Sequence, residues 1–265
     1  MYVDVHVHLD HPAYADDLDA VIVRAKKAGV VAILTQGVHH EVNEQALAIA
    51  RRFPSIVRPA LGLYPCNALN VQNDVSDEAD GYKRVTTVGV DETLSFIRTH
   101  TREIAAIGEV GLDFKFSSDR EHQSENFRKI IALARELKKS LIIHSRKAEK
   151  EVVELLERSG IPKQLVVLHC FSGNKKLIGH ATKLGYTFSI PCNITRSQHF
   201  QMLAMMVPIT QLLTETDGPY LPPDGSTRSE PAHVANTVKK IAELKGIDEQ
   251  ETAQNIFMNY QRLFL

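Results

Sequence analysis

Short β-type segments alternate with helical segments along the 265 residues, and this alternation predicts an α/β fold, specifically a single (β/α)8 TIM barrel. Two observations favour the barrel. Eight β-type segments fit one closed barrel of ordinary size. A doubly wound open sheet would need a glycine-rich phosphate loop after its first strand, and none is present. We expect one domain over residues 1–265, with its functional groups at the carboxyl ends of the strands.

The expected strands are short apolar runs rich in β-branched residues. They cover residues 2–8, 30–36, 56–63, 104–109, 140–144, 165–169, 186–190 and 211–216. The segments between them carry apolar residues at spacings of three and four, such as Phe127, Ile130 and Ala134, which is typical of amphipathic helices. A long polar connection, from about Cys66 to Val90, is expected at the same end of the barrel as the functional groups.

Composition excludes several other classes of protein. The chain is 43% hydrophobic with a formal net charge of −1, so it is neither disordered, nor collagen-like, nor strongly basic. A nucleic-acid partner would therefore have to be bound locally. Three widely spaced cysteines without a CxxC pair predict no disulfide framework. Without a signal peptide or a long apolar span, we expect a cytoplasmic monomer that does not contact membranes.

Polar residues recur where the predicted strands end. They are His6 and His8 on the first strand, Glu109 on the fourth, His144 on the fifth, His169 on the sixth and Asp217 just after the eighth. Residues two apart on a strand share a face, so His6 and His8 point the same way. Because parallel strands end at one rim of a barrel, we expect all six side chains to meet there.

Four imidazoles and two carboxylates are typical ligands of divalent metal ions. Each residue alone has a plainer interpretation, such as a hydrogen-bonded histidine at a strand end or a surface carboxylate. Their shared position at one rim favours the metal site. Six ligands exceed the three that one catalytic zinc ion needs, and Glu109 can bridge two ions roughly 3.5–4 Å apart. We therefore expect two ions that share a hydroxide.

The same segments resemble the TatD family of metal-dependent deoxyribonucleases, within the amidohydrolase-type barrels. They read DVHVH (4–8), GEVGLDF (108–114), IHSR (143–146), HCFSG (169–173), ETDGPYL (215–221) and RSEP (228–231). The segments follow in the family's order, and NYQRLF (259–264) also resembles the family's carboxyl end.

The resemblance implies roles for individual residues. The first ion would be bound by His6, His8, Glu109 and Asp217, and the second by Glu109, His144 and His169. Asp217 would also orient or deprotonate the attacking water. Arg146 and Arg228 would contact the substrate phosphate, for which a planar bidentate donor is suited.

One position departs from the family pattern. Where the family carries Gly-x-His-Pro after the third strand, this chain has Tyr64. A phenol can donate a hydrogen bond to phosphate but carries no positive charge near pH 7. His39 and His40 follow the second strand at the same rim, and they are our candidates to substitute for the missing histidine.

From the residues and the resemblance together, we expect a hydrolase of phosphodiester bonds. The family suggests a deoxyribonuclease that acts as a 3′-5′ exonuclease on single-stranded DNA, activated by Mg2+ or Mn2+. Imidazole-rich ligation also admits Zn2+ or Fe2+ as the resident ion. Two alternatives stay open: hydrolysis of an ester or amide, for example deacylation of an aminoacyl-tRNA, and a metal-dependent nucleic-acid binder without catalysis.

Overall fold

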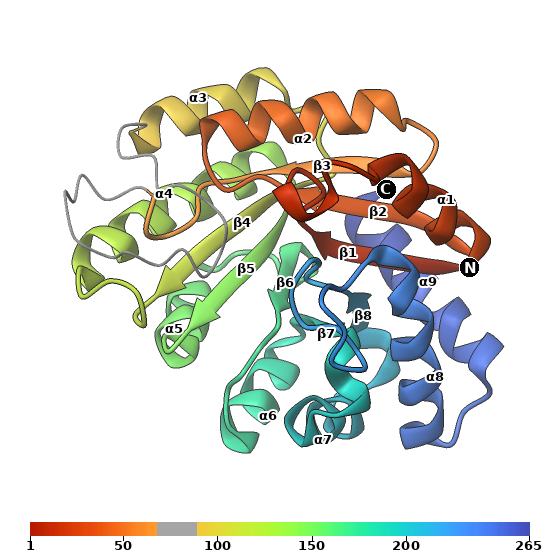
Figure 1. Ribbon diagram of the computed structural model, residues 1–265. Coiled ribbons are helices and arrows are strands. Elements are labelled where there is room, and N and C mark those ends of the chain that lie inside the picture. Colours follow the sequence, from red (N-terminus) through yellow and green to blue (C-terminus); the bar gives the residue numbers. More distant parts are fainter. Residues whose placement is uncertain (68–88) are drawn as a thin grey trace.

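Eight parallel strands follow one another around a barrel in the order of the chain (Figure 1). The protein is described here by a computed structural model over residues 1–67 and 89–265. The strands are β1 (Tyr2–Val7), β2 (Val30–Gln36), β3 (Val57–Leu61), β4 (Ala106–Asp113), β5 (Ser140–Arg146), β6 (Val166–His169), β7 (Thr187–Pro191) and β8 (Leu212–Glu215). The predicted (β/α)8 barrel is therefore confirmed.

Helices cover the outside of the barrel (Figure 1). They are α1 (Leu18–Lys27), α2 (His40–Arg52), α3 (Val90–Thr99), α4 (Arg120–Leu137), α5 (Glu149–Ser159), α6 (Lys175–Leu184), α7 (Gln198–Met206), α8 (Val234–Lys245) and α9 (Glu249–Phe264). Their apolar stripes face the strands: Phe127, Ile130 and Ala134 of α4 are buried, as the spacing predicted. On β1, Val3 and Val5 are fully buried in the same core. The histidines of β1 therefore point away from the helices, since side chains alternate along a strand.

Hydrogen bonds between the first and last strands join the two ends of the sheet. The Thr214 hydroxyl donates to the Val3 carbonyl at 2.6 Å. Just beyond β8, the Asp217 backbone N–H donates to the His6 carbonyl at 2.8 Å. This closure places Asp217 directly beside the histidines that end the first strand.

Two strands run further than predicted. The sequence placed Glu109 and His144 at strand ends, whereas β4 continues to Asp113 and β5 to Arg146. Gly111 pairs with His144 in the parallel register, and a Cβ at Gly111 would lie 2.0 Å from the His144 carbonyl oxygen. Glycine usually weakens a strand, but here it allows the two strands to stay paired. Both predicted ligands therefore lie within their strands.

Most of the predicted polar connection, about Cys66 to Val90, lies outside the described residues, and Val90 begins α3. Glycines in the left-handed conformation end α5, α6 and α8, at Gly160, Gly185 and Gly246. Across residues 1–67 and 89–265, no helix combines the length and apolar character that crossing a membrane requires.

Candidate metal centre

The barrel brings together the six side chains that the sequence analysis singled out. They come from β1 and the residue after it (His6, His8), from β4 (Glu109), β5 (His144) and β6 (His169), and from the loop after β8 (Asp217). Four of them are at least 95% buried. The side chains of His144 and Asp217 keep 13% and 17% of their surface exposed. The site is therefore nearly closed, with access on the side of these two residues.

The Glu109 carboxylate divides the set into two groups. Its Oε2 lies 3.5 Å from Nε2 of His6 and 3.5 Å from Nε2 of His8. Its Oε1 lies 2.7 Å from Nδ1 of His144 and 3.6 Å from Nε2 of His169. Each oxygen thus faces a different pair of imidazole nitrogens, as a carboxylate that bridges two ions would.

Asp217 adds a second carboxylate to the first group. Its Oδ1 lies 3.5 Å from His6 Nε2 and 3.7 Å from His8 Nε2. Within residues 1–67 and 89–265, neither ring nitrogen of the fully buried His6 has a hydrogen-bond partner. Such atoms are rare, because leaving a buried polar group unsatisfied is unfavourable. A divalent cation bound by imidazole and carboxylate would satisfy Nε2, so these residues fit the ions that the sequence analysis expected.

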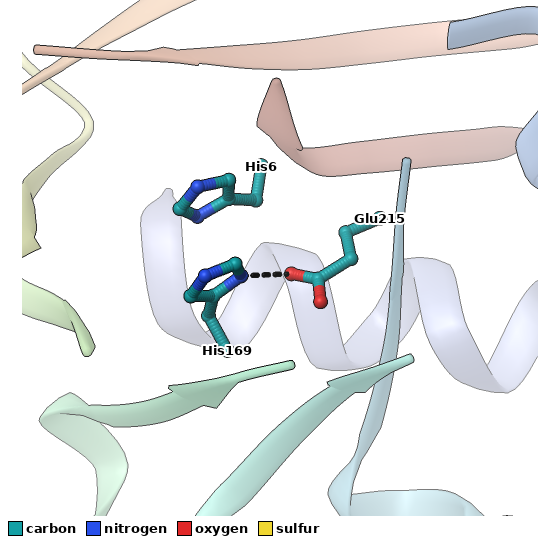
Figure 2. Close-up of side chains that lie close together, drawn as sticks. All are labelled: His6, His169 and Glu215. Atoms are coloured by element: carbon teal, nitrogen blue, oxygen red, sulfur yellow. Dashed lines mark hydrogen bonds and ion pairs between the residues drawn. The ribbon is translucent and has the colours of Figure 1, made fainter. Parts of the chain in front are cut away.

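Two further carboxylates orient the histidines of β5 and β6. Asp113 Oδ2 lies 3.0 Å from Nε2 of His144, and Glu215 Oε2 lies 3.1 Å from Nδ1 of His169 (Figure 2). Each contact fixes the proton on the outer nitrogen and turns the other nitrogen toward Glu109. Neither acid was assigned a role from the sequence. The available signal was their even spacing from a predicted ligand, four residues from Glu109 and two from Asp217; within β4 this spacing places Asp113 on the same face as Glu109.

Glu215 also lies near His6, whose ring stacks on that of His169 with centroids 3.6 Å apart and planes 6° from parallel (Figure 2). Both oxygens of Glu215 already accept hydrogen bonds. Oε1 accepts one from the Cys170 backbone N–H at 2.9 Å, and Oε2 one from the Ser189 hydroxyl at 2.5 Å. We therefore interpret Glu215 as an orienting carboxylate and not as a ligand.

A buried acid on β1 supports the opposite side of the centre. Asp4 Oδ1 accepts hydrogen bonds from the backbone N–H groups of His6 at 3.2 Å and Thr216 at 3.0 Å. Its Oδ2 accepts one from the Thr216 hydroxyl at 2.5 Å. The next residue, Asp217, has a φ of +54°, a left-handed conformation that is uncommon without glycine. Asp4 thus ties Thr216, the residue before this strained position, to the backbone of β1.

Mutual contacts set the charges of the predicted ligands. Burial alone would raise the pKa of Glu109, but its contacts with the His144 and His6 imidazoles hold that pKa well below its usual range. The pKa of Asp217 is lowered too, since contacts with His8 and His169 outweigh burial. Burial, reinforced by the charge of His169, lowers the pKa of His6. Both carboxylates and a neutral His6 are therefore in the forms that bind metal.

Two other candidates lie beside the centre. The Tyr64 hydroxyl donates to Asp113 Oδ2 at 2.5 Å and lies 3.4 Å from His144 Nε2. The residue that replaces the family histidine therefore contacts the carboxylate that orients a predicted ligand. Arg146 ends β5 with an exposed side chain, and its guanidinium Cζ lies 4.7 Å from the centroid of the Phe116 ring.

The remaining candidates have other contacts. Arg228 donates to the Ala13 carbonyl and, at 2.5 Å, to Asp17. His39 is buried at the start of α2. His40 packs its ring against Phe96 with centroids 4.9 Å apart and faces Glu44 at 3.8 Å. The described contacts of His39 and His40 do not reach the six predicted ligands, and their suggested substitution for the family histidine stays a hypothesis.

Comparison with known proteins shows which family the chain belongs to. The family model described as "TatD related DNase" matches residues 3–265. The chain belongs to this family. It is 34% identical to the human protein "Deoxyribonuclease TATDN3", over 99% of this chain and 94% of that protein. It is 32% identical to "3'-5' ssDNA/RNA exonuclease TatD" of Erwinia tasmaniensis, over 98% of each.

A solved TatD structure also shares the fold. YjjV from Escherichia coli, described as a TatD homolog, superposes with a TM-score of 0.83 at 26% identity, covering 99% of this chain and 97% of that one. Membership of the family makes this TatD protein a hydrolase, and specifically a metal-dependent nuclease.

Proposed function

We propose that this TatD protein removes nucleotides from the 3′ end of single-stranded DNA, with two divalent ions bound at Glu109. The observation that carries the proposal is the division of the Glu109 oxygens between two histidine pairs. The first ion would be bound by Glu109, His6, His8 and Asp217, and the second by Glu109, His144 and His169. When bound, Mg2+ or Mn2+ would lower the pKa of the attacking water and neutralise charge on the phosphate; Zn2+ or Fe2+ suit the same ligands.

Asp217 would accept the proton of the attacking water. Its carboxylate faces the centre, and its lowered pKa keeps it ionised at neutral pH. The hydrogen bond from its backbone N–H to the His6 carbonyl and the Asp4–Thr216 contacts hold it in place. A general base fixed in this way needs little rearrangement during the reaction.

Preference for the ends of single strands is supported by charge and by a relative. With a net charge of −1, the chain lacks the overall positive field that favours non-specific binding to duplex DNA. The Erwinia relative is named a 3'-5' ssDNA/RNA exonuclease. We therefore expect strand ends to be drawn in by the bound ions and by local cations, and not by the whole surface.

Incubation with 5′-labelled single-stranded DNA, after chelator treatment and metal add-back, tests the proposal. We expect a ladder that shortens from the 3′ end only when Mg2+ or Mn2+ is present. Asp217→Asn should lower turnover about 100-fold or more, as loss of a general base does, while metal analysis confirms that the ions stay bound. Turnover near that of the wild type would refute the general-base role. If the protein hydrolysed a p-nitrophenyl ester or a lactone but did not cleave DNA, its activity would be that of an esterase and the proposed nuclease activity would be refuted.

The remaining expectations belong to the same proposal. All six predicted ligands come from one chain, so a monomer that forms one domain over residues 1–265 would be sufficient for activity. We keep the cytoplasm as its proposed location. Sedimentation analysis that shows a stable dimer at working concentrations would contradict the monomer.

A further inference from the structure

Two exposed cations flank a phenylalanine ring at the edge of the centre. Arg146 Cζ lies 4.7 Å and Lys115 Nζ lies 5.0 Å from the centroid of Phe116. The same connection holds a second pair, in which Arg120 Cζ lies 4.5 Å from the ring centroid of Phe114. Contacts between a cation and an aromatic face are attractive and restrict the cation to one side of the ring. Three contacts between a cation and an aromatic ring thus involve the phenylalanines of the segment that follows β4.

This segment is attached directly to the centre. Asp113 Oδ1 accepts hydrogen bonds from the backbone N–H of Lys115 at 2.8 Å and of Phe116 at 3.0 Å. The other oxygen of Asp113 orients His144. Arg146 stands two residues beyond His144 on β5, on the same face and about 7 Å further along the strand. The cations therefore lie next to the predicted metal ligands, beyond them toward solvent.

The two arginines suggested as phosphate ligands differ in their contacts. Arg228 is paired with Asp17 and the Ala13 carbonyl, and only 26% of its side chain is exposed. Arg146 is exposed, and its guanidinium makes no hydrogen bond or ion pair with any residue in the described part of the chain. Its donors can therefore bind an anion without breaking an existing contact.

The family resemblance already implies that Arg146 contacts substrate phosphate. We propose that Lys115 shares this contact, that the phosphate is the backbone phosphate next to the scissile one, and that Phe116 positions the guanidinium. The inference rests on the proposed nuclease function and adds a substrate-binding surface to it. A guanidinium binds phosphate through two parallel hydrogen bonds. Grooves that bind single strands commonly combine cations along the backbone with aromatic rings. Phe116 is a positioning residue, because it acts through Arg146.

Salt-dependent binding tests the inference. A fluorescent oligothymidylate with uncleavable phosphorothioate linkages is titrated at about 50 to 200 mM NaCl with metal-loaded protein. Arg146→Gln and Lys115→Gln should each reduce the slope of log Kd against log salt, and together by about 0.7, the value for one phosphate contact on a single strand. Arg146→Gln should also weaken binding about tenfold. Phe116→Leu keeps both charges but should raise KM about threefold with little change in kcat.

The opposite end of the barrel offers a matched control. There Arg52 Cζ lies 5.0 Å from the ring centroid of Phe53, so Arg52→Gln and Phe53→Leu should leave binding and its salt slope unchanged. A wild-type protein that neither binds nor cuts the oligonucleotide would refute the proposed function itself. A wild type that binds, with slopes unaltered in Arg146→Gln and Lys115→Gln, would refute only this inference. An unchanged KM in Phe116→Leu would remove the positioning role.

Discussion

The two histidine pairs at the barrel mouth are supported in different ways. His144 and His169 each have one ring nitrogen in contact with a buried carboxylate, at 3.0 and 3.1 Å. The ring nitrogens of His6 have no hydrogen-bond partner in the described part of the chain. Its strand is instead fixed through the backbone by Asp4. On the side of His144 and His169, carboxylates hold the imidazole rings in place. On the side of His6, Asp4 holds the backbone of the strand. The two proposed ions should therefore depend on different supporting residues.

Removing the group that the two sides share should have the largest effect. Glu109 faces both histidine pairs, so Glu109→Gln should lower the affinity for both ions and reduce DNA turnover by more than about 100-fold, beyond the usual effect of an orienting residue. Metal content by mass spectrometry and a nuclease assay measure the two losses. Glu103→Gln, an exposed acid paired with Arg51, is the control. If one ion stayed at full affinity, Glu109 would not be a bridge.

A substitution at Asp4 should destabilise the fold on the side of His6, where the backbone of the strand is held in place. Asp4→Ala leaves the buried N–H groups of His6 and Thr216 without their acceptor, which should lower the free energy of unfolding by about 2–4 kcal/mol. Urea unfolding of chelator-treated protein measures this loss. Thr216→Val removes the hydroxyl contact and should cost less, about 1–2 kcal/mol. Equal losses in the two variants would mean that the backbone contacts of Asp4 contribute nothing.

The support of the His144 side by a carboxylate is tested by a substitution at Asp113. Asp113→Asn keeps the size of the side chain but weakens the contact with His144 Nε2, so the affinity for one ion should fall about 10- to 100-fold. Calorimetric titration with Mn2+ resolves the two binding events. The second event, assigned to His6 and His8, should keep its affinity. An equal fall in both would show that the two sides are not independent.

Tyr64 should have a smaller effect on the same side. Tyr64→Phe removes one hydrogen bond to Asp113, worth about 1 kcal/mol, so affinity for the ion at His144 should fall about fivefold. Tyr186→Phe, just before β7 and buried, is the matched control. Tyr64→His would restore the family residue, and a gain in DNA turnover there would assign the histidine a direct role toward substrate. A Tyr64→Phe protein with wild-type metal affinity would contradict the supporting role.

The smallest effect concerns an ion-pair cluster between α1 and the loop after β8. Hydrogen bonds from Arg228 and Arg24 lower the pKa of Asp17 to about 2. Because the folded-state pKa lies below the unfolded one, this contribution to stability is complete above about pH 4 and is lost as pH falls toward 2. Asp17→Asn should lose less than about 1 kcal/mol at pH 7, because 34% of the Asp17 side chain is exposed and solvent screens the pair. At pH 2 the two proteins should be equally stable; a difference that grows on acidification would contradict the assignment.

The fold and the meeting of the six predicted side chains could be read from the sequence, because both follow from parallel strands that run toward one rim. The supporting residues could not. Asp113 and Glu215 are carboxylates on buried strands. The pairing of β4 with β5 shows that Asp113 contacts His144. The pairing of β6 with β7, and of β7 with β8, shows that Glu215 contacts His169. Arg228 suits a phosphate ligand by residue type, yet in the fold its donors contact Asp17 and Ala13. Such contacts depend on the positions of side chains far apart in the sequence.

The closure of β1 on β8 also determines when the centre can form. The ligands extend from His6 to Asp217, and Asp217 reaches His6 only after the last strand has joined the first. A chain still emerging from the ribosome holds the other five ligands, but it lacks the carboxylate and the backbone contacts that complete the site. Because pairings between distant segments form slowly, tight binding of the two proposed ions would be a late event. It would mark a finished barrel, and metal uptake could therefore serve as a reporter of complete folding.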